Sequence, residues 1–213
     1  MTTAPELTLF SYWRSSAAYR VRLALAWKGL AYDVVPIDLR MGAQSAPEYT
    51  ALNPQGLVPL LRIGDVSLTQ SLAVIEYLDE VYPEPPLLPN DAVGRARVRA
   101  AAQTISSDVH PINNLRVLRY LKEELGASQL QADAWAQHWI NAGLETLERF
   151  GEQFGGQFLF GDSITIADVC LVPQLYNACR LDTDLSKYGR LIAIDAKVRE
   201  HPELTPAHPE NQT

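Results

Sequence analysis

The stretch Ser11-Tyr-Trp-Arg-Ser-Ser-Ala-Ala-Tyr-Arg-Val-Arg-Leu-Ala-Leu25 leads from a short alternating strand into a run of helix-forming residues. We expect the strand at Leu7 to Tyr12 and the end of the helix at Gly29, a favourable C-cap residue. The first N–H groups of a helix have no intrahelical acceptor, so a direct strand-to-helix turn presents them to an anion, a thiolate or a carboxylate. Ser15 or Ser16 is therefore either a simple N-cap or a hydroxyl that also contacts a ligand.

The composition is that of a globular chain with an acidic balance. It has 213 residues, 47% of them hydrophobic, with 18 basic and 25 acidic side chains and a net charge of −7. This balance argues against a nucleic acid or an anionic membrane as the main partner. We find neither an apolar stretch long enough to span a membrane nor a secretory leader, and we expect a cytoplasmic protein. Cys170 and Cys179 are too far apart along one predicted helix for a disulfide, and we expect two reduced core residues.

The first eighty or so residues predict a small α/β domain with a mixed sheet. A right-handed crossover makes the first two strands parallel, and the Gly64-Asp65 turn makes the next two antiparallel. The order is β-α-β followed by β-β-α, and Ser71 is a plausible N-cap of the second helix. The expected strands after the first are Tyr32–Ile37, Gly56–Ile63 and Val66–Thr69, and the expected second helix is Leu72–Glu80.

The rest of the chain predicts an all-helical domain after a linker. Four prolines between Pro83 and Pro89 neither continue a helix nor join a sheet. We therefore expect domains at residues 1–82 and 91–213, joined by 83–90. The expected helices are 92–125, interrupted or kinked near Pro111, then 132–154, one beginning at the capping box Thr165-Ile-Ala-Asp168, and 191–199, followed by a frayed tail after Pro202.

Several motifs in register resemble the glutathione transferase superfamily. Within it, the serine-rich stretch is similar to the zeta class, which contains the maleylacetoacetate isomerases and the maleylpyruvate isomerases. The similarity covers nearly the whole chain, to about Asp195. It is carried by Ser11–Arg22, Asn53-Pro54, Gln70–Leu78, His110–Leu118 and Ala167–Gln174. The resemblance implies a thioredoxin-like domain followed by a helical domain, and glutathione as the cofactor.

The resemblance also implies a role for each residue of a glutathione site. Ser15 would contact the sulfur, with Ser16 and the first-turn amides beside it. Val58-Pro59, joined by a cis peptide bond, would present a backbone N–H and C=O to the cysteinyl part. Gln70 and Ser71 would hold the γ-glutamyl end. Taken one at a time, each of these residues also fits a purely structural role.

One position departs from the zeta pattern. The motif usually reads Ser-Ser-Cys, and the third residue here is Ala17. There is also no Cys-x-x-Cys, so thioredoxin-type exchange is excluded and a disulfide or dehydroascorbate reductase is disfavoured. Glutathione must then supply the sulfur of the reaction.

The substrate side is expected to carry cations, because maleyl acids of this family are dianions. Three arginines resemble positions around the second pocket of the family, namely Arg14, Arg116 and Arg180. His110 and Asn114 lie four residues apart on one predicted helix face and are candidates for glutathione binding, with a structural role for His110 equally open. They have no third ligand at a suitable spacing, so we expect no metal site.

The resulting hypothesis is a glutathione-dependent cis–trans isomerase. It would convert maleylacetoacetate to its fumaryl isomer by reversible thiolate addition, with Ser15, Ser16 and Arg14 as the catalytic residues. The alternatives are a maleylpyruvate isomerase of gentisate breakdown, a general conjugating transferase and a non-catalytic glutathione-fold binding protein. The family suggests a homodimer with a small dicarboxylate as substrate. Asp168 is assigned to folding.

Overall fold

The computed structural model describes residues 6–212 of the chain. These residues divide into two compact units. One contains the residues up to Pro85 together with those from Pro202 onward, and the other is Pro86–His201. Residues 1–5 and Thr213 of the predicted domains lie outside the described part.

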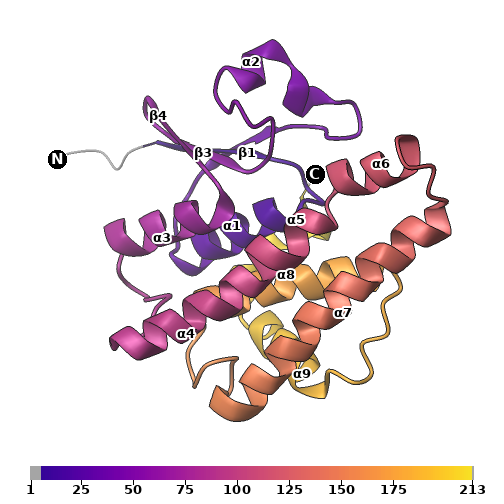
Figure 1. Cartoon of the computed structure of the whole chain (residues 1–213). Helices are drawn as coiled ribbons and strands as arrows, with labels where there is room; N and C mark the ends of the chain where they lie inside the picture. The colour runs from indigo at the N-terminus through magenta and orange to yellow at the C-terminus, as the bar shows by residue number, and fades with distance from the viewer. Residues whose placement is uncertain (1–5, 213) are drawn as a thin grey trace. The chain divides into compact units, whose positions relative to one another are not determined.

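The first unit is built on a four-stranded mixed sheet in the order β2-β1-β3-β4. β1 pairs in parallel with β2 and antiparallel with β3, and β3 pairs antiparallel with β4, so the predicted β-α-β and β-β-α order is confirmed. Helices α1 and α3 cover one face of the sheet, and α2 lies on the opposite side (Figure 1). The bounds are β1 Leu7–Ser11, α1 Ser16–Trp27, β2 Asp33–Pro36, η1 Ala43–Ser45, α2 Pro47–Thr50, β3 Leu60–Ile63, β4 Val66–Thr69 and α3 Ser71–Val81.

Two local details differ from the sequence-based expectation. β3 begins at Leu60 rather than Gly56, because Pro59 has no N–H to donate to a ladder. Val58-Pro59 itself is a cis peptide bond, as the resemblance implies. The N-cap of α3 is Gln70, with φ 68° and no side-chain cap bond, and Ser71 is the first helical residue.

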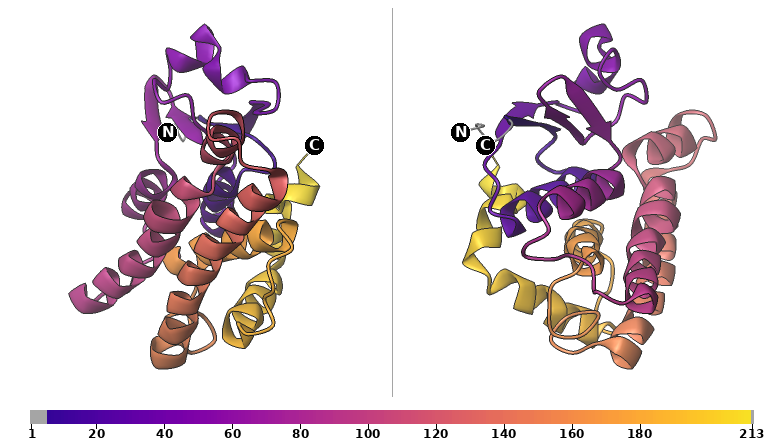
Figure 2. Two further views of the ribbon diagram at one scale, coloured as in Figure 1. Left: turned by 45° about the vertical axis from the view of Figure 1, so that its right-hand side comes forward. Right: turned by 90° about the vertical axis from the view of Figure 1, so that its left-hand side faces the viewer.

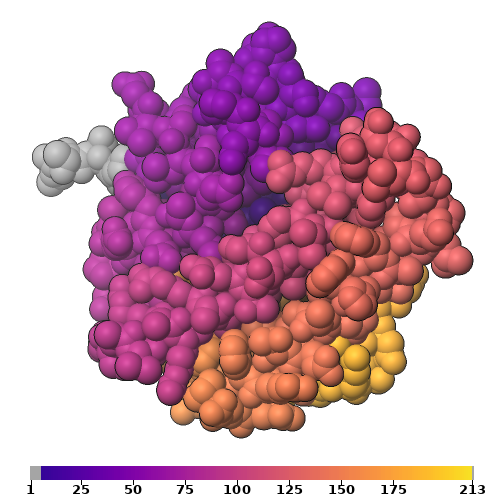
Figure 3. All heavy atoms as spheres, viewed as in Figure 1, coloured from indigo at the N-terminus to yellow at the C-terminus, as the bar shows by residue number. Residues whose placement is uncertain are grey.

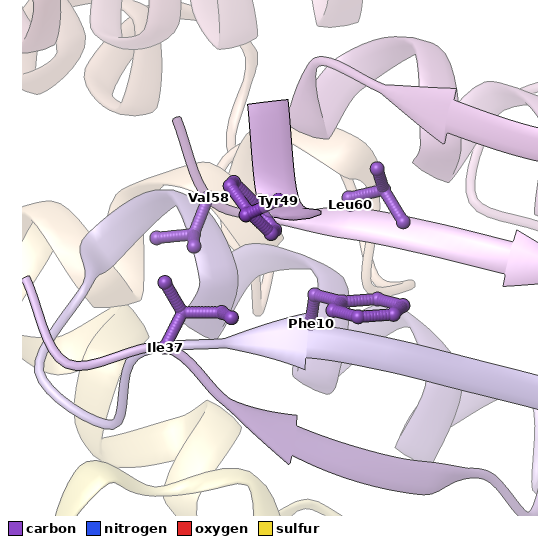
Figure 4. Close-up of a cluster of buried hydrophobic side chains, with 5 residues drawn as sticks. All are labelled: Phe10, Ile37, Tyr49, Val58 and Leu60. Carbon is purple, nitrogen blue, oxygen red and sulfur yellow. The ribbon is translucent and has the colours of Figure 1, made fainter. Parts of the chain in front are cut away.

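A cluster of apolar side chains fixes the end of this sheet that leads into α1. Phe10 of β1 and Leu60 of β3 pack with Ile37, Tyr49 and Val58 (Figure 4). The Tyr49 hydroxyl donates to the carbonyl of Leu57 at 2.6 Å. The loop that presents Val58-Pro59 is thereby held against the ends of β1 and β3.

The second unit is helical, as predicted. The expected helix at 92–125 is interrupted near Pro111, as predicted, since Asn113 leaves helical geometry and Asn114 is extended. It consists of three helices, and a π-helical stretch joins the first two. Thr104–Val109 is the π-helical stretch, a rare feature that occurs mostly as a single turn inside an α-helix. The bounds are α4 Ala92–Gln103, η2 Thr104–Val109, α5 His110–Ile112, α6 Leu115–Glu123, α7 Gln129–Phe154, α8 Ile166–Arg180 and α9 Gly189–Arg199.

Helix α8 is the buried centre of the second unit. Every residue from Ile166 to Leu175 is buried, and α8 packs against α4, α7 and α9. The carbonyl of Leu87 accepts a hydrogen bond from the Ile166 N–H at 2.9 Å, which secures the start of the helix. The other end reaches the surface, so Cys179 is exposed while Cys170 is buried, and the expectation of two core cysteines is wrong for Cys179.

The carboxy-terminal segment differs most from expectation. Residues 202–212 were expected to fray from the helical domain, but they form the 3₁₀ helices η3 (Pro202–Ala207) and η4 (Pro209–Asn211) and belong to the first unit. Leu204 and Ala207 are buried, and η3 packs against α1. Burial of these apolar side chains orders the segment that was expected to fray.

Candidate functional site

The turn between β1 and α1 places Ser15 at the N-cap of α1. Ser15 has extended geometry (φ −68°, ψ 119°), and its Oγ accepts a hydrogen bond from the Ala18 N–H at 3.2 Å. Its own N–H donates to the Tyr12 carbonyl at 2.9 Å. The first turn of α1 contains no acidic residue, so no carboxylate of the chain neutralises the positive end of this helix from within its own first turn.

The Ser15 hydroxyl can serve the helix and a ligand together. A hydroxyl oxygen accepts through its lone pairs and still has one O–H to donate. Ser16 is buried as the first helical residue and Ala17 is half-buried, so Ser15 is the more accessible of the two serines. Arg14 lies over the Trp13 ring, with Cζ 5.3 Å from the ring centroid, and this contact holds its guanidinium beside the turn.

The sheet register brings three of the predicted segments to the same end of the sheet. Phe10 pairs with Leu60, and Leu60 pairs with Thr69. The β1–α1 turn, the Val58-Pro59 loop and Gln70-Ser71 each adjoin one of these paired residues. Segments far apart in the sequence thus meet at the end of the sheet that leads into α1.

Gln70 and Ser71 are held in an unusual geometry at this end. A φ of 68° at a non-glycine residue is uncommon and strained, and strained residues cluster at active sites and ligand-holding positions. The Gln70 Nε2 donates to Gln55 Oε1 at 2.7 Å. The buried Ser71 hydroxyl accepts from Arg20 Nη1 at 3.3 Å, which links α3 to α1. Gln55 and Arg20 are not among the predicted site residues. A lone glutamine after Asn53-Pro54 has no distinctive signal, and Arg20 is one of several arginines in the Ser11–Arg22 stretch.

A pocket of about 330 Å³ lies beside the same turn. Tyr12 and Trp13 line it from the turn, Ile37 and Arg40 from the end of β2, and Gln212 from the carboxy-terminal segment. The Arg40 guanidinium donates to both oxygens of Asp38 and lowers the pKa of that carboxyl to about 2. The pocket therefore combines aromatic walls with a fixed ion pair at its rim.

The second unit contains the other predicted residues. His110 begins α5 and Asn114 is the N-cap of α6, so the expectation that they share one helix face is wrong, because the helix breaks at Asn113 between them. Asn114 Oδ1 accepts from the Arg116 N–H at 3.0 Å. The Arg116 side chain is exposed on α6, a helix with no buried residue that lies at the surface (Figure 3).

Arg180 is the last residue of α8 and is exposed. Its Cζ lies 5.9 Å from the centroid of the Tyr176 ring one turn earlier. The structure thus places Arg14 in the first unit and Arg116 and Arg180 on two different helices of the second. Their joint action on a substrate stays a prediction.

At the start of α8 a carboxylate of the first helical turn binds the cap residue and the segment before the helix. Asp168 is fully buried, and its Oδ1 accepts from the Leu159 N–H at 2.8 Å. Its Oδ2 accepts from the N–H and the hydroxyl of Thr165, both at 2.8 Å. Burial raises the pKa of the Asp168 carboxyl, and these three hydrogen bonds oppose that rise. The arrangement is that of a structural cap.

Residues 6–212 contain neither a candidate metal site nor a candidate membrane-spanning helix. That part of the chain contains no group of three His, Cys, Asp or Glu residues able to hold a metal ion. None of its helices is both long and apolar enough to cross a bilayer.

Comparison with known proteins identifies both halves of the chain. Residues 5–80 match the family model "Glutathione S-transferase, N-terminal domain", and residues 133–204 match "Glutathione S-transferase, C-terminal domain". A probable maleylacetoacetate isomerase of Vibrio cholerae is 47% identical over 97% of both chains. A maleylpyruvate isomerase of a Ralstonia species is 43% identical, over 91% of this chain and 92% of the relative.

Solved structures agree with the sequence matches. The holo structure of a bacterial maleylpyruvate isomerase of the zeta class has a TM-score of 0.94 at 42% identity and covers 96% of this chain and 98% of its own. A maleylacetoacetate isomerase of Methylobacterium extorquens, solved with malonate and glutathione, has a TM-score of 0.94 at 37% identity over 97% and 98% of the two chains. One of Anaeromyxobacter dehalogenans, solved with dicarboxyethyl glutathione and citrate in the active site, has a TM-score of 0.86 at 42% identity over 98% and 97%. Sequence and fold together place this chain in the glutathione S-transferase family, within its zeta class of maleylacetoacetate and maleylpyruvate isomerases.

Proposed function

We propose that this chain is a glutathione-dependent cis–trans isomerase that converts maleylacetoacetate to its fumaryl isomer. The observation that carries the proposal is the N-terminus of α1, where Ser15 caps the helix and no acidic side chain fills the first turn. Relatives that share this fold at similar identity are isomerases of maleyl acids, and two were solved with glutathione or a glutathione derivative.

The residues at the end of the sheet fit the parts of glutathione. Ser71 and the strained Gln70 stand at the start of α3, where N–H groups and a hydroxyl suit the γ-glutamyl carboxylate. Val58 lies just before the first paired residue of β3, so its backbone can pair with the cysteinyl part in an antiparallel fashion. Asn114, whose Oδ1 caps α6, keeps two N–H donors, and with His110 it is the candidate for the glycine carboxylate.

Bound glutathione supplies the thiolate that adds to the cis double bond and leaves after rotation. A free thiol has a pKa of about 8.5, so most of it is protonated at neutral pH. The Ser15 O–H can donate to the sulfur while its oxygen holds the Ala18 N–H. The unneutralised N-terminus of α1 adds a positive potential, and both effects favour the thiolate. Ser16 is buried beside Ser15 as the first residue of α1.

Arginines suit the substrate because a maleyl acid has carboxylates and develops further negative charge at its carbonyl. A guanidinium donates two parallel N–H bonds to a carboxylate, and it also stabilises charge that appears only in the transition state. Arg14, Arg116 and Arg180 are the candidates. The dicarboxylate ligand of one solved relative supports a site of this chemistry.

The deciding experiment measures isomerisation of maleylacetoacetate with and without glutathione. We expect turnover only with glutathione, and Arg180→Ala should lower kcat/KM for maleylacetoacetate at least tenfold while changing conjugation of a neutral electrophile little. Arg119→Ala is the matched control, because Arg119 is exposed and pairs only weakly with Glu123 at 3.8 Å. Isomerisation that needs no glutathione would refute the proposal, and equal losses on both substrates would remove Arg180 from the substrate site.

Maleylpyruvate is the second candidate substrate. The Ralstonia relative and the solved zeta-class structure are maleylpyruvate isomerases at identities close to those of the maleylacetoacetate isomerases. Both substrates have the carboxylates that arginine recognises, so kcat/KM for each acid must be compared in the same preparation. A higher value for maleylpyruvate would assign the chain to that reaction, and conjugation faster than either isomerisation would favour a general transferase.

The proposal extends to assembly and location. Thiol-dependent chemistry and two cysteines that remain thiols suit a reducing compartment, and we place the protein in the cytoplasm. A two-fold homodimer is the commonest closed assembly, and light scattering of the purified chain would test it.

A further inference from the structure

We propose that Arg22 and the carboxy-terminal segment 202–212 form a brace that positions the β1–α1 turn for glutathione. The proposal rests on the assignment of Ser15 to glutathione. Arg22 is a positioning residue in this view, because its guanidinium binds the turn and would act on glutathione through the turn. The carboxy-terminal segment would then contribute to glutathione binding by helping to position this turn.

The guanidinium of Arg22 is the centre of the brace. Its side chain is fully buried, and its Nη2 donates to the Trp13 carbonyl at 3.0 Å. Its Nη1 donates to Ser11 Oγ at 3.1 Å, and its Nε donates to the Ala207 carbonyl at 2.9 Å. One planar group therefore joins the end of β1, the middle of the turn and the last residue of η3.

The two turn contacts bracket the residue that sets the position of Ser15. Ser11 and Trp13 flank Tyr12, whose carbonyl accepts the Ser15 N–H at 2.9 Å. Ser11 is fixed from the other side too, since its carbonyl accepts the Ile37 N–H of the chain leaving β2 at 2.8 Å. A shift of the Trp13 carbonyl would move Tyr12 and Ser15 with it, because they are consecutive parts of one tight turn.

The carboxy-terminal segment holds the guanidinium from the opposite side. η3 packs on α1, with Leu204 and Ala207 buried, and the right-hand view of Figure 2 shows this end of the chain beside α1. The His208 ring meets the Tyr19 ring edge-on at 5.9 Å, and Arg22 Cζ lies 5.3 Å from the centroid of that same Tyr19 ring. The carboxy-terminal segment, the Tyr19 ring and the Arg22 guanidinium therefore pack together along α1.

The chemistry explains why arginine fits this position and lysine does not. A buried cation is expensive to desolvate, so an apolar side chain would suit a buried helix face that served packing alone. The planar guanidinium presents its donors in fixed directions and reaches three acceptors, whereas one ammonium group cannot bridge all three in this geometry. Tying three segments together is what the arginine adds.

The test compares glutathione binding and the acidity of bound glutathione in full-length variants. We expect Arg22→Met to weaken the glutathione Kd about tenfold, as loss of hydrogen bonds from a charged group would, and to raise the pKa of the bound thiol by about one unit. Arg22→Lys should recover part of both effects, and Arg119→Met should change neither. Ultraviolet absorbance of the thiolate against pH gives the pKa. A folded Arg22→Met protein with unchanged Kd and unchanged thiol pKa would overturn the proposal.

Two milder substitutions keep the test decisive even where Arg22→Met fails to fold. Ser11→Ala removes one acceptor, and Ala207→Leu pushes a buried residue of η3 away from α1, so each should raise the thiol pKa. Thr205→Leu adds bulk at an exposed position of the same segment and should leave the thiol pKa unchanged. A wild-type thiol pKa in both Ser11→Ala and Ala207→Leu would also refute the brace. Ser15→Ala separates the assumptions, since unchanged turnover there would remove the glutathione assignment itself.

Discussion

Two helix N-termini of this protein meet the same electrostatic requirement in opposite ways. At α8 the buried carboxylate of Asp168 accepts from Leu159 and from both donors of Thr165. At α1 the first turn has no acidic residue, and the cap is the neutral hydroxyl of Ser15, which accepts one N–H. The first N-terminus carries a carboxylate of the chain, and the second is where we propose that an external anion binds.

This difference shows how a cap can be separated from a binding site. Both ends have a favoured cap residue, so residue type alone does not distinguish them. What distinguishes them is whether the positive end of the helix is already neutralised and whether other ligand-binding segments lie beside it. At α1, register brings the Val58-Pro59 loop and Gln70-Ser71 to the same end of the sheet.

The largest effect should come from making α1 resemble α8. Ser15→Asp places a carboxylate where the thiolate is proposed to lie, so glutathione binding should weaken at least about a hundredfold through like-charge repulsion. The free energy of unfolding should stay level or rise, since Asp caps as well as Ser. Calorimetric titration with glutathione and urea unfolding measure the two quantities.

A matched control for this change is Ser128→Asp. Ser128 is also a serine N-cap, at the exposed start of α7, where its Oγ accepts from the Gln131 N–H. Glutathione affinity should not change there. Equal affinity losses at Ser15 and Ser128 would show that the loss at Ser15 is not local to the α1 N-terminus.

The next largest effect concerns stability and should occur at α8. Asp168→Ala leaves buried N–H groups of Leu159 and Thr165 without their acceptor, and should lower the free energy of unfolding by about 2–4 kcal/mol. Asp91→Ala, at the exposed N-cap of α4, removes a single bond to Gly94 and should lower it by about 1 kcal/mol. Urea unfolding gives both values. The KM for glutathione of folded Asp168→Ala protein should equal that of the wild type, and a large rise would assign Asp168 a role in binding.

A smaller effect follows from the pH dependence of the same carboxylate. Burial raises the pKa of Asp168 above its ordinary value of 3.8, so the folded state binds this proton more tightly than the unfolded state. The stability that Asp168 contributes through this shift is therefore present below that ordinary value and is lost as the pH rises through the raised pKa. Urea unfolding at several pH values, compared with the non-titrating Asp168→Asn protein, measures the difference. A difference that grows with pH in favour of the wild type would contradict the direction of the shift.

The smallest effect should come from restoring the usual zeta-class cysteine beside Ser15. Ala17→Cys adds a thiol in the first turn of α1, where the helix N-terminus should lower its pKa below about 8.5. If glutathione provides the reacting sulfur, kcat should change less than about twofold, and turnover should still require glutathione. Alkylation rates against pH measure the thiol pKa. Isomerisation by this variant without glutathione would show that a protein thiol at this position can replace the cofactor.

Short sequence patterns were sufficient to predict those elements in which one local interaction dominates. The Gly64-Asp65 hairpin, the helix after Ser15 and the Thr165–Asp168 box were all predictable, because each depends on residues a few positions apart. An interruption near Pro111 was predictable from that proline, but the π-helical stretch before it was not, because it has no strong local signature. Gln55 was missed for a related reason, because only folding brings it to Gln70.

The sequence by itself determined the α/β and helical parts of the chain, the serine turn and the family, because hydrophobic spacing, caps and motif order are properties of neighbouring residues. Only the tertiary structure decided which partners those residues meet. Register placed Val58-Pro59 and Gln70-Ser71 at one end of the sheet, and burial of Leu204 and Ala207 brought the end of the chain onto Arg22. Such contacts depend on packing between distant segments, and no local pattern of residues encodes them.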